Sequence, residues 1–116
     1  MPSLADPDAA VSYLADISPQ LRGCAILDEA GSVLASSGDG EDAEWQRAAG
    51  ALMRAVDGAS GERAAHAHIA TPDGEVFLVR QDGLIGIAGT ERFVLASLMV
   101  FDLRAALREL ASGRGG

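Results

Sequence analysis

The sequence predicts an α+β domain with α-β-α layers, in which a five-stranded antiparallel sheet lies between helices. The first observation is a β-hairpin pattern over residues 22–37 that leads directly into a helix with an acidic start. The second is a series of three further apolar segments, separated by tight turns at Thr71–Gly74 and Asp82–Gly83. The third is a helical period of 3.6 residues at both ends of the chain and between the two groups of strands. The expected element order is therefore αββαβββα.

Composition and charge exclude several functions. The 116 residues, 48% of them hydrophobic, suffice for one core, so we expect a single domain over 1–111 and a flexible tail over 112–116. The formal net charge of −8 argues against nucleic acid and anionic membranes, which are bound through clustered basic residues. All basic residues are arginine, which excludes a P-loop lysine and a lysine Schiff base. No leader or membrane-spanning stretch is visible, so we expect a cytoplasmic protein.

The first helix and the hairpin are predicted from local signals. Asp6 is a favourable N-cap and Pro7 suits the first helical turn, so a helix is expected to begin there and to end at Ser18-Pro19. The hairpin turns at Asp28–Gly31, where acidic residues suit a type I turn and Gly31 suits a left-handed conformation. The apolar face expected for the first helix comprises Ala10, Val11, Leu14 and Ile17.

The second helix is expected over residues 41–56, with Asp39 or Asp42 as its cap and Asp57–Gly61 as its stop. Gly50 is unusual, because a glycine inside a helix costs about 1 kcal/mol relative to alanine. Two explanations are open: another backbone approaches Gly50 closely, or the glycine is tolerated at the surface. The expected core face comprises Trp45, Ala48, Ala49, Leu52, Met53 and Val56. The opposite face comprises Ala43, Arg47, Gly50, Ala51 and Arg54.

The remaining strands are expected over 63–71, 75–81 and 84–88, and a last helix is expected from a cap at Thr90–Arg92 to about Leu110. Strands 24–27 and 84–88 are apolar throughout, as strands covered on both faces are, so both belong at the centre. Joining hairpin neighbours then gives the order 2-1-5-4-3. The alternating segment around His66 and His68 becomes an open edge, which predicts a homodimer because unpaired backbone groups recruit another strand. A heterodimer with a sister chain is the open alternative.

No combination of residues indicates catalysis. His66 and His68 project from one face of a strand, and could be half of a metal site completed across a dimer, a pH-sensitive interface or a plain interface pair. Two ligands alone rarely hold zinc, so we expect no metal. The acidic run from Asp39 to Glu44 fits helix capping better than a calcium loop. Cys24, the single cysteine, is expected to be a buried apolar residue, and we expect no catalytic residue and no cofactor.

The order of elements and several local motifs together resemble the roadblock/dynein light chain family, which has a profilin-like fold. The hairpin motif is ILDEAGSVLASSGD, followed by the amphipathic helix DAEWQRAAGALMRAV. The second hairpin, IATPDGEVFLVRQDG, the strand LIGIAG and the closing amphipathic helix complete the resemblance over residues 5–110. The third strand contains fewer aliphatic residues than the family pattern leads us to expect.

The resemblance implies a non-enzymatic, dimeric platform of bacterial type that binds a Ras-like small GTPase as a scaffold or as an activator of hydrolysis. It implies that third strands pair and second helices lie side by side. Arg47 or Arg54 acting as an arginine finger is a further option. The alternative function is a small-ligand sensor of the profilin-like or PAS-like kind. The implied dimer interface is Gly50, Met53, Ala65, His66, Ala67 and His68, and the implied partner-binding residues are Trp45, Arg47, Gly50 and Arg54.

Overall fold

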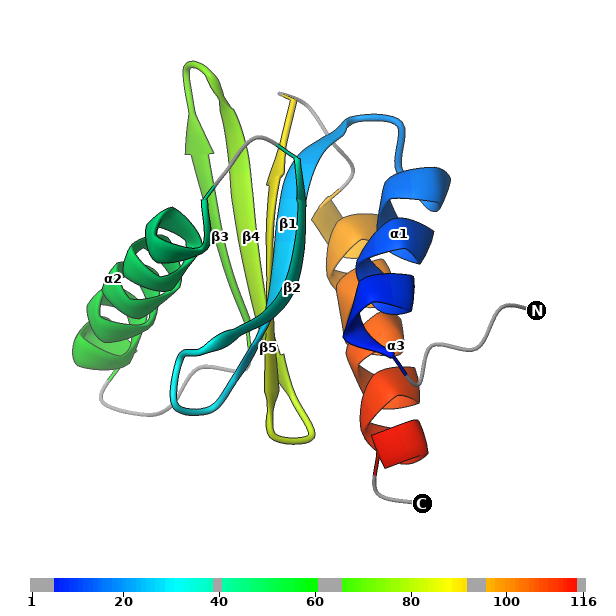
Figure 1. Cartoon of the computed structure of the whole chain (residues 1–116). Helices are drawn as coiled ribbons and strands as arrows, with labels where there is room; N and C mark the ends of the chain where they lie inside the picture. The colour runs from blue at the N-terminus through cyan, green and yellow to red at the C-terminus, as the bar shows by residue number, and fades with distance from the viewer. Residues whose placement is uncertain (1–5, 39–40, 61–65, 92–95, 115–116) are drawn as a thin grey trace.

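The structure is a three-layer α/β/α arrangement (Figure 1). The computed structural model describes residues 6–38, 41–60, 66–91 and 96–114. The five strands form one antiparallel sheet in the predicted order, β2-β1-β5-β4-β3. In Figure 1, α2 covers one face of this sheet, and α1 and α3 cover the other. The elements are α1 (Pro7–Ile17), β1 (Leu21–Asp28), β2 (Val33–Gly38), α2 (Asp42–Ser60), β3 (His66–Thr71), β4 (Gly74–Gln81), β5 (Leu84–Thr90) and α3 (Ala96–Arg114).

The β1–β2 turn is closed by the residues that predicted it. The backbone N–H of Gly31 donates to the carbonyl of Asp28 at 3.0 Å, and Gly31 adopts a φ of +92°. The Asp28 carboxylate accepts a second bond, from the N–H of Ser32 at 2.9 Å. Only glycine adopts such a φ without steric cost, so this turn confirms the type I turn with a left-handed glycine.

The first helix also follows the prediction. Asp6 is its N-cap, and its carboxylate accepts a hydrogen bond from the N–H of Asp8 at 3.1 Å. Ala10, Val11 and Leu14 are buried, as their spacing predicted. Ile17 differs, with 40% of its surface exposed, because it lies at the last position of the helix.

The second helix differs from the prediction at both ends. The N–H of Trp45 donates to the carbonyl of Glu41, so Glu41 holds the cap position and Asp42 is the first helical residue. Asp39 lies outside the described residues. At the other end the helix continues to Ser60 instead of ending at Val56. Arg80 of β4 binds the Asp57 carboxylate in this last part of α2, a tertiary contact that the local sequence does not reveal.

The sheet separates two apolar cores. Ala25, Leu27, Ile85 and Ile87 face α2, whereas the alternate residues of the same strands face α1 and α3. Of the residues expected on the core face of α2, Ala49 and Leu52 are buried, Trp45 and Met53 are half-buried, and Ala48 is exposed. Ala48 lies about 70° from the centre of that face, which leaves a small side chain in solvent. The side chain of Val56 lies outside the described residues.

The last helix ends later than predicted. It extends to Arg114, so Ser112 to Arg114 are helical, although we expected a flexible tail there. Arg92, part of the expected cap, lies outside the described residues, and Thr90 is the last residue of β5. Residues 63–65, the expected start of the third strand, also lie outside. Within the described residues, no helix is long and apolar enough to cross a membrane.

Candidate partner-binding surface on α2 and β3

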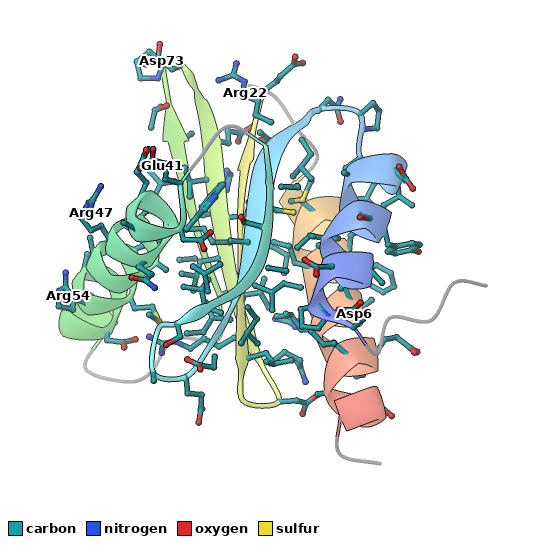
Figure 2. The ribbon with its side chains drawn as sticks, in the orientation of Figure 1. Asp6, Arg22, Glu41, Arg47, Arg54 and Asp73 are labelled. Carbon is teal, nitrogen blue, oxygen red and sulfur yellow. The ribbon has the colours of Figure 1, made fainter. Side chains whose placement is uncertain are left out.

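The outer surface of α2 carries two exposed arginines, Arg47 and Arg54. Figure 2 shows both side chains pointing away from the sheet. Neither forms a hydrogen bond or an ion pair with any residue in the described part of the chain. Both are therefore available to an acidic partner, as expected for residues on the implied partner-binding surface.

Gly50 lies directly beneath the Arg54 side chain. A Cβ atom at Gly50 would lie 3.2 Å from Nη1 of Arg54, and the next two nearest atoms also belong to the Arg54 guanidinium. That distance is tighter than an ordinary van der Waals contact, so the missing side chain makes room for the guanidinium. The structure thus gives Gly50 a role inside one chain, which the sequence did not suggest.

A cleft of about 860 Å³ lies between α2 and the β1–β2 turn. Its apolar part includes Ala49 and Ile85, both 1% exposed, and the half-buried Met53. Its polar part includes an ion pair in which Arg80 donates to both carboxylate oxygens of Asp57, at 3.2 and 2.8 Å. The lining residues are Glu29, Ala30, Gly31, Gln46, Ala49, Gly50, Met53, Arg54, Asp57, Arg80 and Ile85.

Nothing in the sequence predicts this cleft. Asp57 and Arg80 are 23 positions apart, and only the sheet order brings β4 under the end of α2. Glu29 occupies the turn that its sequence context predicts, and nothing in that context signals that the turn forms a wall. The available signal was Gly50, which pointed to an unusual site on α2 without identifying it.

The two sides of α2 differ in character. Successive helical residues are about 100° apart, so Gln46, Gly50 and Met53 lie on one side of the helix, toward the cleft. The exposed residues on the opposite side are Glu44, Ala48, Ala51 and Ala55. Because the β1–β2 turn forms the far wall of the cleft, this alanine side faces away from β2, toward the β3 half of the sheet.

Trp45 lies beneath α2 rather than on its outer surface. Its indole ring packs against Gly23, where an added Cβ would lie 3.2 Å from atom Cζ2. The indole Nε1 is buried and has no hydrogen-bond partner among the residues that the structure describes. Trp45 therefore packs against β1 beneath α2 and is half-buried, and its expected contact with a partner stays a prediction.

Strand β3 forms one edge of the sheet and pairs only with β4 among the described strands. His66 is exposed and Ala67 is buried, 8% exposed, against the α2 side. His68 stacks on Phe77 of β4, with ring centroids 4.3 Å apart, and its Nε2 lies 2.7 Å from Oε1 of Glu75. Ala65 lies outside the described residues. Within the described residues, no three His, Cys, Asp or Glu side chains are grouped as metal ligands.

Cys24 is buried in the core between the sheet and α1. Burial raises the pKa of its thiol, and a contact of 3.4 Å with the Ser37 hydroxyl lowers it in part. A thiol with a raised pKa is a weak nucleophile at neutral pH. This placement confirms the expected apolar role.

Comparisons with solved structures show which fold this is. No family model and no curated protein matches the chain. A roadblock/LC7 domain from Streptomyces avermitilis is 16% identical with a TM-score of 0.78, covering 92% of this chain and 96% of its own. MglB of Myxococcus xanthus is 12% identical with a TM-score of 0.74, covering 97% and 90%. The gliding protein MglB of Thermus thermophilus is 14% identical with a TM-score of 0.71, covering 91% and 86%. The chain has the roadblock/LC7 fold, which confirms the fold that the resemblance implied.

Proposed function

From the roadblock/LC7 fold of this chain, we propose a dimeric platform that binds a Ras-like small GTPase and regulates it. The observation that carries the proposal is the agreement of the whole chain with solved roadblock/LC7 and MglB structures, at TM-scores up to 0.78. The open edge of β3 and the exposed arginines of α2 support it, because they are surfaces that a dimer and a partner would use.

In the proposed dimer, β3 of one protomer pairs with β3 of the other, so that two sheets become one. His66, Ala67 and His68 then lie at the two-fold axis, together with Ala65. Ala48, Ala51 and Ala55 allow the two α2 helices to pack closely, because small side chains shorten the distance between helix axes. Gly50 and Met53 line the cleft side of α2, so in this proposal they belong to the partner surface rather than to the dimer interface.

Regulation has two forms on such a platform. A scaffold binds the GTPase without changing its chemistry, whereas an activator orients the GTPase's own catalytic residues or supplies an arginine such as Arg47 or Arg54. If an arginine finger is present, changing it to alanine removes most of the activation, because the finger contributes about 10³-fold or more to the rate of hydrolysis. A scaffold leaves the rate of hydrolysis unchanged.

Binding to purified Ras-like GTPases of the source organism, each loaded with GDP or with a non-hydrolysable GTP analogue, tests the proposal. We expect the full chain to bind at least one of them, with different affinity for the two nucleotide states. Hydrolysis with and without the chain then separates activator from scaffold. Absence of binding to every GTPase in both states contradicts the proposed function, although the fold remains.

The alternative, a small-ligand sensor, has one observation in its favour. The cleft beside α2 combines an apolar floor with charged side chains, as ligand sites do. Its walls are formed by exposed side chains of α2 and of a turn, which suits an exposed segment of a protein better than an enclosed ligand. We therefore retain the platform as the proposed function.

A further inference from the structure

The geometry points to a specific binding site in the cleft between α2 and the β1–β2 turn. We propose that each protomer receives there an extended segment of the GTPase that carries a carboxylate next to an apolar side chain. This inference rests on the proposed function, because it identifies where and by what chemistry the partner binds.

The floor of the cleft fits an apolar side chain. Ala49 and Ile85 are 1% exposed and belong to the core between α2 and the sheet. Met53 packs against the same core and remains half-buried, so its flexible side chain is partly in solvent. Methionine adapts its shape to different partners, and covering it removes apolar surface from water.

Arg54 supplies the positive charge for the carboxylate. Its guanidinium lies over Gly50 at the rim of the cleft, exposed and without a hydrogen bond or an ion pair to any described residue. Arg80, the other cation of the cleft, is 11% exposed and already binds Asp57 through two nitrogen atoms. The planar guanidinium of Arg54 is therefore the one that can bind a carboxylate in a bidentate manner.

The charge of the surrounding surface favours the binding of an acidic segment in the cleft over its binding elsewhere on the chain. The chain has a formal net charge of −8, so most of its surface repels an acidic segment. In the cleft the charges balance, because Arg54 and Arg80 are matched by Glu29 and Asp57. Glu29 has an interaction of its own, and Asp57 is neutralised by Arg80. An acidic group is thus tolerated here and bound by Arg54.

The length and position of the cleft suit a segment rather than a single side chain. Its α2 wall extends from Gln46 to Asp57, a distance of about 16 Å along the helix axis. An extended chain spans that distance with about five residues. The cleft lies on the side of α2 opposite the alanines assigned to the dimer contact, so both copies stay open in the proposed dimer.

The chemistry of the site is tested first with a small probe, 3-phenylpropionate, which joins an apolar ring to a carboxylate. In NMR titrations of the full chain we expect shifts confined to the cleft residues, with a dissociation constant on the order of 1 mM for a fragment of this size. The uncharged 3-phenylpropanol should bind at least about fivefold more weakly, because it lacks the ion pair with Arg54. Arg54→Gln should weaken the binding of 3-phenylpropionate by a similar factor. Arg108→Gln, which removes the same charge from the exposed face of α3, should leave its binding unchanged.

The second arm uses any GTPase that binds the full chain. Arg54→Gln and Met53→Asp should each weaken that complex about tenfold or more, whereas Arg108→Gln should not. Equal binding by wild type and Arg54→Gln, or shifts by the probe outside the cleft, overturns the site while the proposed function stands. A probe that binds in the cleft while no GTPase binds the chain overturns the segment as the occupant and indicates a small carboxylic acid instead.

Discussion

Gly50 and Arg54 form a unit on the outer surface of α2. The glycine removes a Cβ atom that would press on the guanidinium at 3.2 Å, and Arg54 lies over the backbone in the space that results. Gly50 costs the helix about 1 kcal/mol relative to alanine, and in return it leaves room for the Arg54 guanidinium. The sequence marks Gly50 as unusual, but the contact with the Arg54 side chain is neither of the two explanations that the sequence offered, and it depends on the coordinates of Arg54.

Replacing this glycine tests that account. Gly50→Ala should raise the free energy of unfolding by about 0.5–1 kcal/mol in urea denaturation, because the gain in helix propensity exceeds the cost of moving a flexible arginine. Ala51→Gly, at the neighbouring exposed position, is the matched control and should lower stability by a similar amount. A destabilised Gly50→Ala variant would show that something less mobile than Arg54 needs the space.

Asp102 of α3 gives a pH-dependent prediction. Burial raises the pKa of its carboxyl, so the folded state binds this proton more tightly than the unfolded state. Stability from this group is therefore lost as the pH rises through the raised pKa. Asp102→Asn should be more stable than wild type at pH 7, by up to about 0.5 kcal/mol. The difference should vanish below the unfolded pKa, about 3.9.

The control for this prediction is Asp16→Asn, which removes the same charge from an exposed position of α1. It separates the effect of net charge from that of burial. Denaturation of the three proteins at several pH values provides the measurement. A gain for Asp102→Asn that persists unchanged at low pH would contradict the assigned cause.

At the scale of elements, the sequence predicts the features that local signals determine, and it does not predict those that depend on contacts between distant segments. The start of α1, the Asp28–Gly31 turn and the strand order follow from caps, turn residues and apolar patterns, all of which operate over a few positions. The end of α2 does not, because Asp57 in its last turn is bound by Arg80, 23 positions further along the chain. The cleft was missed for the same reason: its walls come from three parts of the chain.

The ion pair at the end of α2 has a measurable effect on that element. Asp57→Asn keeps the size of the side chain but removes the charge that Arg80 binds, and Arg80 is 11% exposed. We expect a loss of about 1 kcal/mol in the free energy of unfolding. Amide hydrogen exchange should accelerate in residues 57–60, since glycine and serine do not maintain a helical turn alone. Unchanged exchange in this turn would show that the pair does not hold it.

Strand β3 shows the same division. Its position at the edge was predicted from its alternating pattern and is confirmed. The contacts of His68 with Phe77 and Glu75 depend on register with β4, which the sequence did not specify. The histidine therefore has partners inside its own chain, and any role at a dimer interface is added to those contacts.

At the scale of the whole molecule, the proposed dimer uses the features that a single chain leaves open. These are the edge of β3 and the alanine side of α2, which share the same half of the sheet. A dimer through these features presents two α2 helices, each with its own cleft, on one face. The opposite face is covered by α1 and α3 (Figure 1).

A charge at the edge strand tests this assembly. His66→Glu places two carboxylates close together when β3 pairs with β3, and like charges across paired strands are destabilising. We expect the dimer dissociation constant, measured by analytical ultracentrifugation, to rise about tenfold or more. His66→Gln is the control, and the far-ultraviolet circular dichroism of both variants should match wild type. Unchanged dimerisation of His66→Glu would place the interface elsewhere.

The most direct test of the dimeric platform is the mass of the full chain by light scattering after size exclusion, alone and with each Ras-like GTPase in its two nucleotide states. The chain is 11.9 kDa, so the account predicts about 24 kDa alone, from two copies. With a GTPase it predicts a larger complex in one nucleotide state that contains two copies of this chain. A mass of one copy alone, with no complex in either state, would contradict the account.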